Sequence, residues 1–266
     1  MEGALAGRRR ARATVLAVGL ASGSLLLLLV LLTIRTWQGP DIFYHLFLGR
    51  RILDGGGFQP ADDLLVRQPQ YVNLYWLFQV IAELLHRAGG VTAASLLFTA
   101  VWTAVCALWA RAAGCLRRPA IGLPLALGAI LILGSRFEPR PEAFSYLWLI
   151  LQLGWLSAWD PTARTPVRFY VLFAASQALW ANMHGYFVLG PLLVAARLAG
   201  AWLRREERRA WRRPALLLVL ALAASCLSPF GWRTWAFAHT LAAFLRSVGG
   251  AITEFGPPTG AFLRVW

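Results

Sequence analysis

Residues 14–34 read TVLAVGLASGSLLLLLVLLTI and carry no charged side chain. About twenty apolar residues are enough to cross the roughly 30 Å hydrocarbon core of a bilayer as one α-helix. Four arginines between positions 8 and 12 precede the stretch, so a secretory signal peptide is the alternative interpretation. The apolar run is long for such a peptide, and no small-x-small cleavage site follows it. We therefore predict a retained first transmembrane helix.

The whole chain has the composition of a membrane protein. Of its 266 residues, 58% are hydrophobic and 14% are charged, which is more apolar than a water-soluble domain. All 26 basic residues are arginine and the net charge is +14, a balance that would indicate nucleic-acid binding in a soluble protein. In a membrane protein such arginines flank the spans and contact anionic headgroups. We expect membrane lipids, and no nucleic acid, as partners. The three cysteines lack the spacing of a zinc site.

The apolar stretches predict an all-α fold, a polytopic transmembrane bundle of about seven spans. The predicted spans are 14–34, 91–110, 119–134, 143–159, 169–183, 186–203 and 214–227. The stretch 168–204 is too long for one span and short for two. We therefore predict a hairpin that turns at residues 182–185, slightly below the membrane surface. Its backbone must be buried in protein or line a wet cavity, because lipid offers it no hydrogen bonds.

The arginine distribution sets the predicted orientation. With a cytoplasmic N-terminus, fifteen arginines and four acids face the cytoplasm, against ten arginines and eight acids on the other side. This agrees with the positive-inside rule. We predict one transmembrane domain over residues 1–266 and two outer segments. The first, residues 38–90, contains interfacial helices, of which 75–87 is too short and too polar to span. The second, residues 228–266, includes a further interfacial helix at 235–248 and would begin a C-terminal part.

Unusual polar residues share the outer face of this topology. They are Asp41, His45, Arg136, Glu138, Arg140, Asn182, His184 and Glu254. Ionisable groups at membrane depth are costly, so the set is a candidate site. Asp41 and His45 are four residues apart, hence on one helical face, and the helix N-terminus favours an ionised Asp41. Such a carboxylate would accept a proton from a hydroxyl or hold a divalent cation; the alternative is that it only complements the helix dipole.

The other candidates offer donors to anions. Arg136 and Arg140 have fork-shaped guanidinium groups suited to phosphate oxygens, unless they pair with neighbouring acids and headgroups in an interfacial loop. Asn182 and His184 would bind a sugar hydroxyl or a pyrophosphate, with ordinary turn chemistry as the alternative. Glu254 would complete the rim of the cavity.

Several sequence motifs together resemble a known family. They are GPDIFYHL (39–46), GRRILDGGGFQP (49–60), YWLFQ (75–79), RPE (140–142), LWANMHG (179–185), SPFG (228–231) and ITEFGPP (252–258). This series resembles bacterial polytopic membrane proteins that are similar to the C-fold glycosyltransferases. Phe43 and Tyr44 stand where that pattern usually has tryptophans, and Ser228 where it usually has asparagine.

The resemblance implies a function. Enzymes of that fold take a sugar from a polyprenyl-phosphate donor at the outer leaflet, and an acid of the first outer loop is their base. Asp41 occupies the matching place, which implies an inverting membrane glycosyltransferase of the cell envelope in the bacterial inner membrane. Many relatives continue beyond Trp266, which leaves three alternatives: a fragment, a two-chain enzyme whose membrane-protein partner supplies a C-terminal half, or a degenerate, inactive copy. The alternative is a non-catalytic protein, either a subunit that binds or translocates the lipid carrier or a truncated inactive homologue. An ion-coupled transporter is disfavoured because Arg197 is the only charged residue within a span.

Overall fold

The computed structural model of the chain describes residues 2–33, 40–58, 72–115, 117–134, 137–204 and 208–237. Over these residues the regular structure is helical, without strands, so the predicted all-α fold is confirmed. The elements follow in this order: α1 (Glu2–Thr33), α2 (Pro40–Leu53), α3 (Trp76–Ala112), α4 (Pro119–Leu133), α5 (Glu142–Ala158), α6 (Val167–Ala181), the 3₁₀ turn η2 (Gly185–Val188), α7 (Leu189–Leu203) and α8 (Arg208–Ser225).

Three stretches of the described chain are long and apolar enough to cross a membrane. They are Thr14–Leu32 in α1, Trp76–Ala112, and Gly185–Leu203, which joins η2 to α7. The chain is therefore a helical membrane protein. α4 is apolar but has 15 residues, or about 22 Å. α5, α6 and α8 have 17, 15 and 18 residues. Each predicted span overlaps a helix, and three of the seven overlap the three long apolar stretches.

α3 consists of two helical pieces that meet at a glycine pair. Gly89 has φ −158° and ψ 25°, and Gly90 has φ 61° and ψ −153°, so neither residue is helical. A positive φ is a conformation that glycine adopts without the penalty a Cβ atom imposes. The break lies where the sequence predicts a boundary between an interfacial helix at 75–87 and a span that begins at residue 91. The axis of the first half of α3 can therefore point in a different direction from the axis of the second half.

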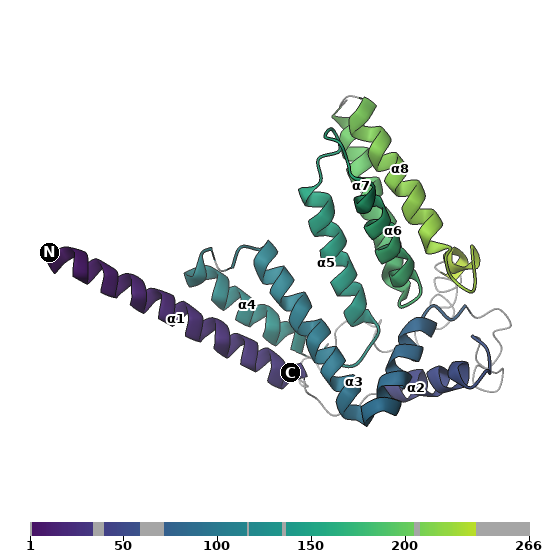
Figure 1. Cartoon of the computed structure of the whole chain (residues 1–266), viewed down its shortest axis with the longest axis horizontal. Coiled ribbons are helices and arrows are strands. Elements are labelled where there is room, and N and C mark those ends of the chain that lie inside the picture. Colours follow the sequence, from purple (N-terminus) through teal and green to yellow (C-terminus); the bar gives the residue numbers. More distant parts are fainter. Residues whose placement is uncertain are drawn as a thin grey trace, which may run out of the picture.

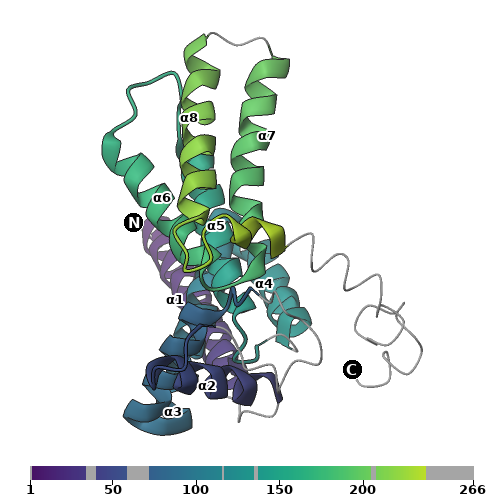
Figure 2. The same cartoon turned by 90° about the vertical axis from the view of Figure 1, so that its right-hand side faces the viewer.

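The helices form two groups that meet near one end. α5, α6, α7 and α8 pack together, while α1 and α4 accompany the second half of α3 (Figure 1). α2 lies across the first half of α3, below the ends of α5 and α6, as both views show (Figures 1 and 2). A cluster of edge-to-face aromatic rings, Phe78, Phe98 and Phe144, joins α3 to α5. This packing fixes the end of the molecule where the chain's polar residues gather.

A buried polar network links α5, α6 and α8. Gln152 Nε2 donates to Ser176 Oγ at 3.0 Å and to Gln177 Oε1 at 3.2 Å. Gln177 Nε2 donates to Ser225 Oγ and to the Phe187 carbonyl oxygen, each at 2.9 Å. Buried amides need such partners because lipid and packed side chains provide none. The network ties η2 to three helices and so holds the turn before α7.

Candidate functional site

α2 presents Asp41 and His45 toward the rest of the molecule. Asp41 lies in the first turn of the helix, which begins at Pro40. On the side of α2 that packs inward, Ile42, Leu46 and Leu48 are buried. His45 is buried as well, whereas Asp41 stays exposed. The helix therefore holds one accessible carboxylate above one enclosed imidazole.

The loop between α4 and α5 brings an arginine to Asp41. Arg140 Nη2 lies 3.6 Å from Asp41 Oδ2, and Arg140 Nε donates to Glu138 Oε2 at 2.8 Å. The guanidinium thus sits between two carboxylates that come from different segments. Three of the predicted site residues meet directly in this way. This arrangement holds the positively charged guanidinium of Arg140 at a fixed place beside the Asp41 carboxylate, which faces solvent.

His45 lies in a pocket built by the start of α3. Gln79 Nε2 is 3.4 Å from His45 Nδ1, and Gln79 exchanges two hydrogen bonds with Asn73, at 2.7 and 3.1 Å. Burial lowers the pKa of His45 from 6.5 to about 4, with Asp41 opposing this shift and Arg140 adding to it. The imidazole is therefore neutral near pH 7. Because Nδ1 faces the Gln79 amide donor, the proton is on Nε2.

His184 is held by a second set of contacts, in the turn between α6 and η2. Trp180 Nε1 donates to Ser145 Oγ at 2.8 Å, and Ser145 Oγ lies 2.8 Å from His184 Nδ1. The Tyr186 backbone N–H also donates to His184 Nδ1, at 3.4 Å. Burial, together with His45, lowers the pKa of His184 to about 4. This imidazole too is neutral near pH 7, with its proton on Nε2.

Tyr75 connects the two histidines. Its ring centroid lies 5.6 Å from that of His45 and 5.6 Å from that of His184. Burial raises the pKa of Tyr75 to about 12, and the nearby Tyr186 and Glu142 add to the effect. The phenol therefore stays protonated. Tyr75, Ser145 and Gln79 are missing from the predicted site, although Tyr75 and Gln79 stand in one of the motifs that carry the family resemblance.

Asn182 has a different place from the other candidates. Its Oδ1 accepts from Trp76 Nε1 at 2.6 Å, and its Nδ2 donates to the carbonyl oxygens of Ala178 and Leu227 at 2.7 and 2.8 Å. The Asn182 carbonyl oxygen also accepts from the Leu77 backbone N–H. The amide thus brackets α3, α6 and the end of α8. Three of these four hydrogen bonds, with Trp76, Leu77 and Leu227, reach segments far from Asn182 in the chain, and the role of Asn182 in ligand binding stays a prediction.

Two predicted site residues, Arg136 and Glu254, lie outside the described residues, as does most of the predicted interfacial helix at 235–248. Within the described ranges no group of three or more His, Cys, Asp or Glu side chains is arranged to hold a metal ion. The described site therefore consists of Asp41, Glu138 and Arg140 beside the enclosed pair His45 and His184.

An apolar cavity of about 690 Å³ lies between α1, α3, α4 and α5. Leu29, Trp102, Ile130 and Tyr146 are among the residues that line it. The Trp102 ring packs on Phe137 with centroids 4.9 Å apart, and Phe137 precedes Glu138 in the loop that carries Arg140. One wall of the cavity, at Trp102, therefore contacts the loop that carries Arg140. Its volume falls within the roughly 300–1,000 Å³ typical of ligand pockets.

Comparisons with known proteins give no match. No protein-family model, no curated protein and no solved structure matches the chain.

Proposed function

We propose that this protein is a C-fold membrane glycosyltransferase with seven spans. It would transfer a sugar from a polyprenyl-phosphate donor to an acceptor at the outer face of a bacterial inner membrane. The observation that carries the proposal is the ion pair of Asp41 and Arg140. A solvent-facing carboxylate and a guanidinium, from segments far apart in the chain, are the base and the phosphate ligand that this reaction needs.

The reaction follows from these two groups. Arg140 would bind the donor phosphate, whose oxygens compete with Asp41 for its Nη2 and so release the carboxylate. Asp41 would then take the proton of the acceptor hydroxyl as that oxygen bonds to the anomeric carbon. The bond from the anomeric carbon to the phosphate oxygen breaks, and its electron pair leaves with the polyprenyl phosphate. Attack opposite to the leaving group inverts the anomeric carbon.

The surroundings suit such a donor. The neutral His45 and His184 carry protons on Nε2, and a neutral donor binds a phosphate or sugar oxygen without adding charge to the site. The apolar cavity between α1, α3, α4 and α5 has room for part of a hydrocarbon chain. A lipid whose tail enters past Trp102 would bring its phosphate to the loop that carries Arg140. These features support a lipid-linked donor over a soluble sugar nucleotide.

Sugar transfer by the purified chain in lipid discs tests the proposal. Wild-type protein should consume a polyprenyl-phosphate sugar when an acceptor is present, and Asp41→Asn should lower the rate by about 10²–10⁴-fold, as expected for loss of a general base. Asp160→Asn is the matched control, because Asp160 is exposed at the opposite end of α5 and accepts hydrogen bonds from Thr162 in its own loop. If Asp41→Asn transfers sugar at the wild-type rate, Asp41 is not the base of the reaction.

A second candidate function is favoured by the same ion pair. Arg140 is paired with two carboxylates, Asp41 and Glu138, and a phosphate-binding arginine held in this way also suits a non-catalytic subunit that binds or translocates the lipid carrier. This candidate predicts that polyprenyl phosphate raises the thermal stability of wild-type protein and of Asp41→Asn equally, with no sugar released by either. The transfer assay and the stability assay together separate the two functions.

A further inference from the structure

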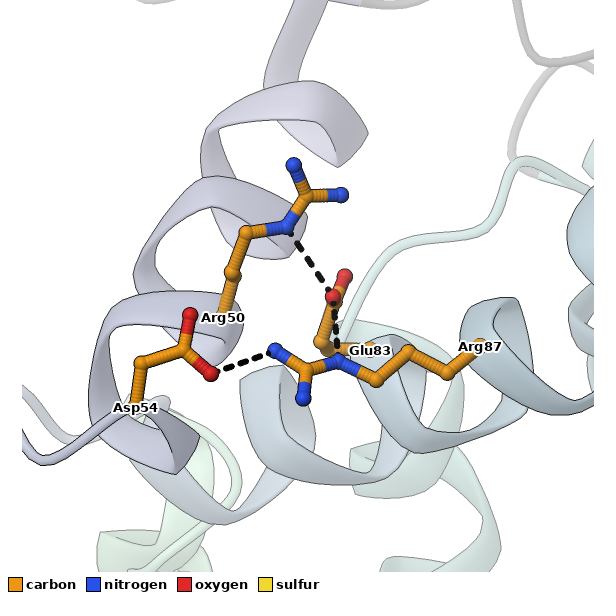
Figure 3. Close-up of polar contacts among 4 residues, drawn as sticks. All are labelled: Arg50, Asp54, Glu83 and Arg87. Carbon is orange, nitrogen blue, oxygen red and sulfur yellow. Dashed lines mark hydrogen bonds and ion pairs between the residues drawn. The ribbon is translucent and has the colours of Figure 1, made fainter.

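Two arginines from different helices share one buried carboxylate beside the start of a span. Arg50 of α2 lies 3.2 Å from Glu83 Oε1, and Arg87 of α3 lies 2.9 Å from the same oxygen, each through Nε. Arg87 Nη2 also lies 2.8 Å from Asp54 Oδ1. Figure 3 shows both guanidinium groups converging on the Glu83 carboxylate. The side chain of Glu83 is 0% exposed, whereas those of Arg50 and Arg87 are 58% and 44% exposed.

The contacts leave hydrogen-bond donors on the outside. Among the described residues, both terminal nitrogens of Arg50 and one of Arg87 have no partner. A guanidinium has five N–H donors in a planar fork that matches two oxygens of a phosphate. Because Glu83 holds Nε of each arginine, the side chains are ordered before a ligand arrives, which lowers the entropy cost of binding.

The position of Arg87 sets the depth of the pair. Arg87 precedes the break at Gly89 and Gly90, and the predicted span begins at residue 91. Four residues of chain span at most about 14 Å, so Arg87 lies close to the headgroups if the second half of α3 crosses the bilayer. Arg50 lies at the same level, because both arginines contact the same oxygen of Glu83.

The exposed face of α2 fits the boundary between headgroups and acyl chains. Phe43 and Phe47 are 57% and 49% exposed, and with Arg50 they follow a spacing of four and three residues. This spacing places all three on one side of the helix. Exposed aromatic rings on such a face can enter the acyl-chain region, while the long side chain of an arginine beside them reaches the headgroups. Beside this face, α2 packs on α3, where Leu46 and Gly49 are buried.

We propose that Arg50 and Arg87 bind the phosphate of an anionic phospholipid in the outer leaflet, while Phe43 and Phe47 insert among its acyl chains. Asp54 opposes this binding, since it is a carboxylate beside Arg87 on the same surface. The site is separate from Asp41 and Arg140, so it stands whether or not the protein transfers sugars. Its effect would be to seat α2, and with it the candidate site, at a fixed depth.

Lipid binding to the purified, delipidated full chain tests the proposal. Dissociation constants for phosphatidylglycerol and phosphatidylcholine would be measured by native mass spectrometry in detergent. Wild-type protein should prefer phosphatidylglycerol, and Arg50→Gln or Arg87→Gln should each lower this preference about five-fold, the effect of one arginine near an anionic surface. Asp54→Asn should raise it. Arg168→Gln is the control, because Arg168 is exposed at the predicted cytoplasmic end of α6.

Two further variants and one soluble anion keep the test decisive. If loss of the Glu83 contact unfolds Arg50→Gln, Arg50→Lys keeps a positive charge near Glu83 but lacks the fork, and it should still lower the preference. Phe43→Ser with Phe47→Ser should weaken binding of both lipids. An unchanged preference in the arginine variants, or an equal loss in Arg168→Gln, would overturn the proposal. If an equal concentration of glycerol phosphate displaces phosphatidylglycerol, the ligand of the two arginines is a soluble anion, and the proposal that they bind a phospholipid is overturned.

Discussion

Gly49→Ala is expected to disrupt the candidate site from a distance, through the packing of α2 on α3. A Cβ at Gly49 would overlap the Gln79 carbonyl oxygen and lie 2.7 Å from the Gln79 carbonyl carbon. The Gln79 atoms belong to the backbone, so rotation of a side chain does not relieve the clash. Restoring an ordinary contact of 3.4 Å moves α2 by at least about 0.7 Å. The contact between Gln79 and His45, already 3.4 Å, then exceeds hydrogen-bond distance.

The expected cost is about 1–3 kcal/mol of unfolding free energy, as for other insertions into a packed interior. Reversible unfolding in mixed detergent micelles would measure it, and the transfer assay would report the loss of site geometry. Gly154→Ala in α5 is the matched control, because a Cβ there meets no atom within 4 Å, and it should leave stability unchanged or slightly raised. If the Gly49→Ala variant is as stable as the wild-type protein, the close approach of α2 to α3 is refuted.

Three other changes test the surrounding structure. Since the pKa of His45 and of His184 is about 4 in the folded protein against 6.5 ordinarily, the unfolded chain binds more protons between these values. Stability should therefore be complete above pH 6.5 and fall toward pH 4, by about 3 kcal/mol per histidine, and thermal unfolding of a double His→Gln variant should show a flatter profile. Gly190→Ala should destabilise by about 1–3 kcal/mol, because its Cβ would overlap Gln177 Oε1, as measured by thermal unfolding. Asn182→Ala should cost about 1–3 kcal/mol by leaving buried partners unsatisfied, and Asn182→Asp should cost at least as much in the same assay, because a carboxylate oxygen would replace the Nδ2 donor and face the Ala178 and Leu227 carbonyl oxygens.

Local sequence signals predicted the helices and their breaks. Pro40 begins α2, a change in polarity marks the break at Gly89 and Gly90, and the turn at residues 182–185 lies where the length of the apolar stretch required one. These features depend on neighbouring residues, so periodicity and composition reveal them. The burial of the turn was also expected, because a backbone at membrane depth needs protein partners.

The contacts between distant segments were not predictable in the same way. Ser145 is one hydroxyl in an apolar helix, and nothing near it in sequence shows that it joins Trp180 to His184. Likewise, Gln152 and Gln177 are isolated polar residues in apolar stretches until packing brings them together. Asp41 and Arg140 were predicted to share a membrane face, but only the fold brings them within 3.6 Å.

The central claim is that Asp41 acts as a base on a donor held by Arg140. The most direct test is to measure kcat for sugar transfer and the donor dissociation constant in parallel, for wild type, Asp41→Asn and Arg140→Gln in lipid discs. Asp41→Asn should lower kcat by about 10²–10⁴-fold and leave donor affinity within a few-fold of wild type, whereas Arg140→Gln should weaken donor binding as well. If wild-type protein binds the donor but transfers no sugar to any acceptor offered, or if Asp41→Asn retains full kcat, the claim is contradicted.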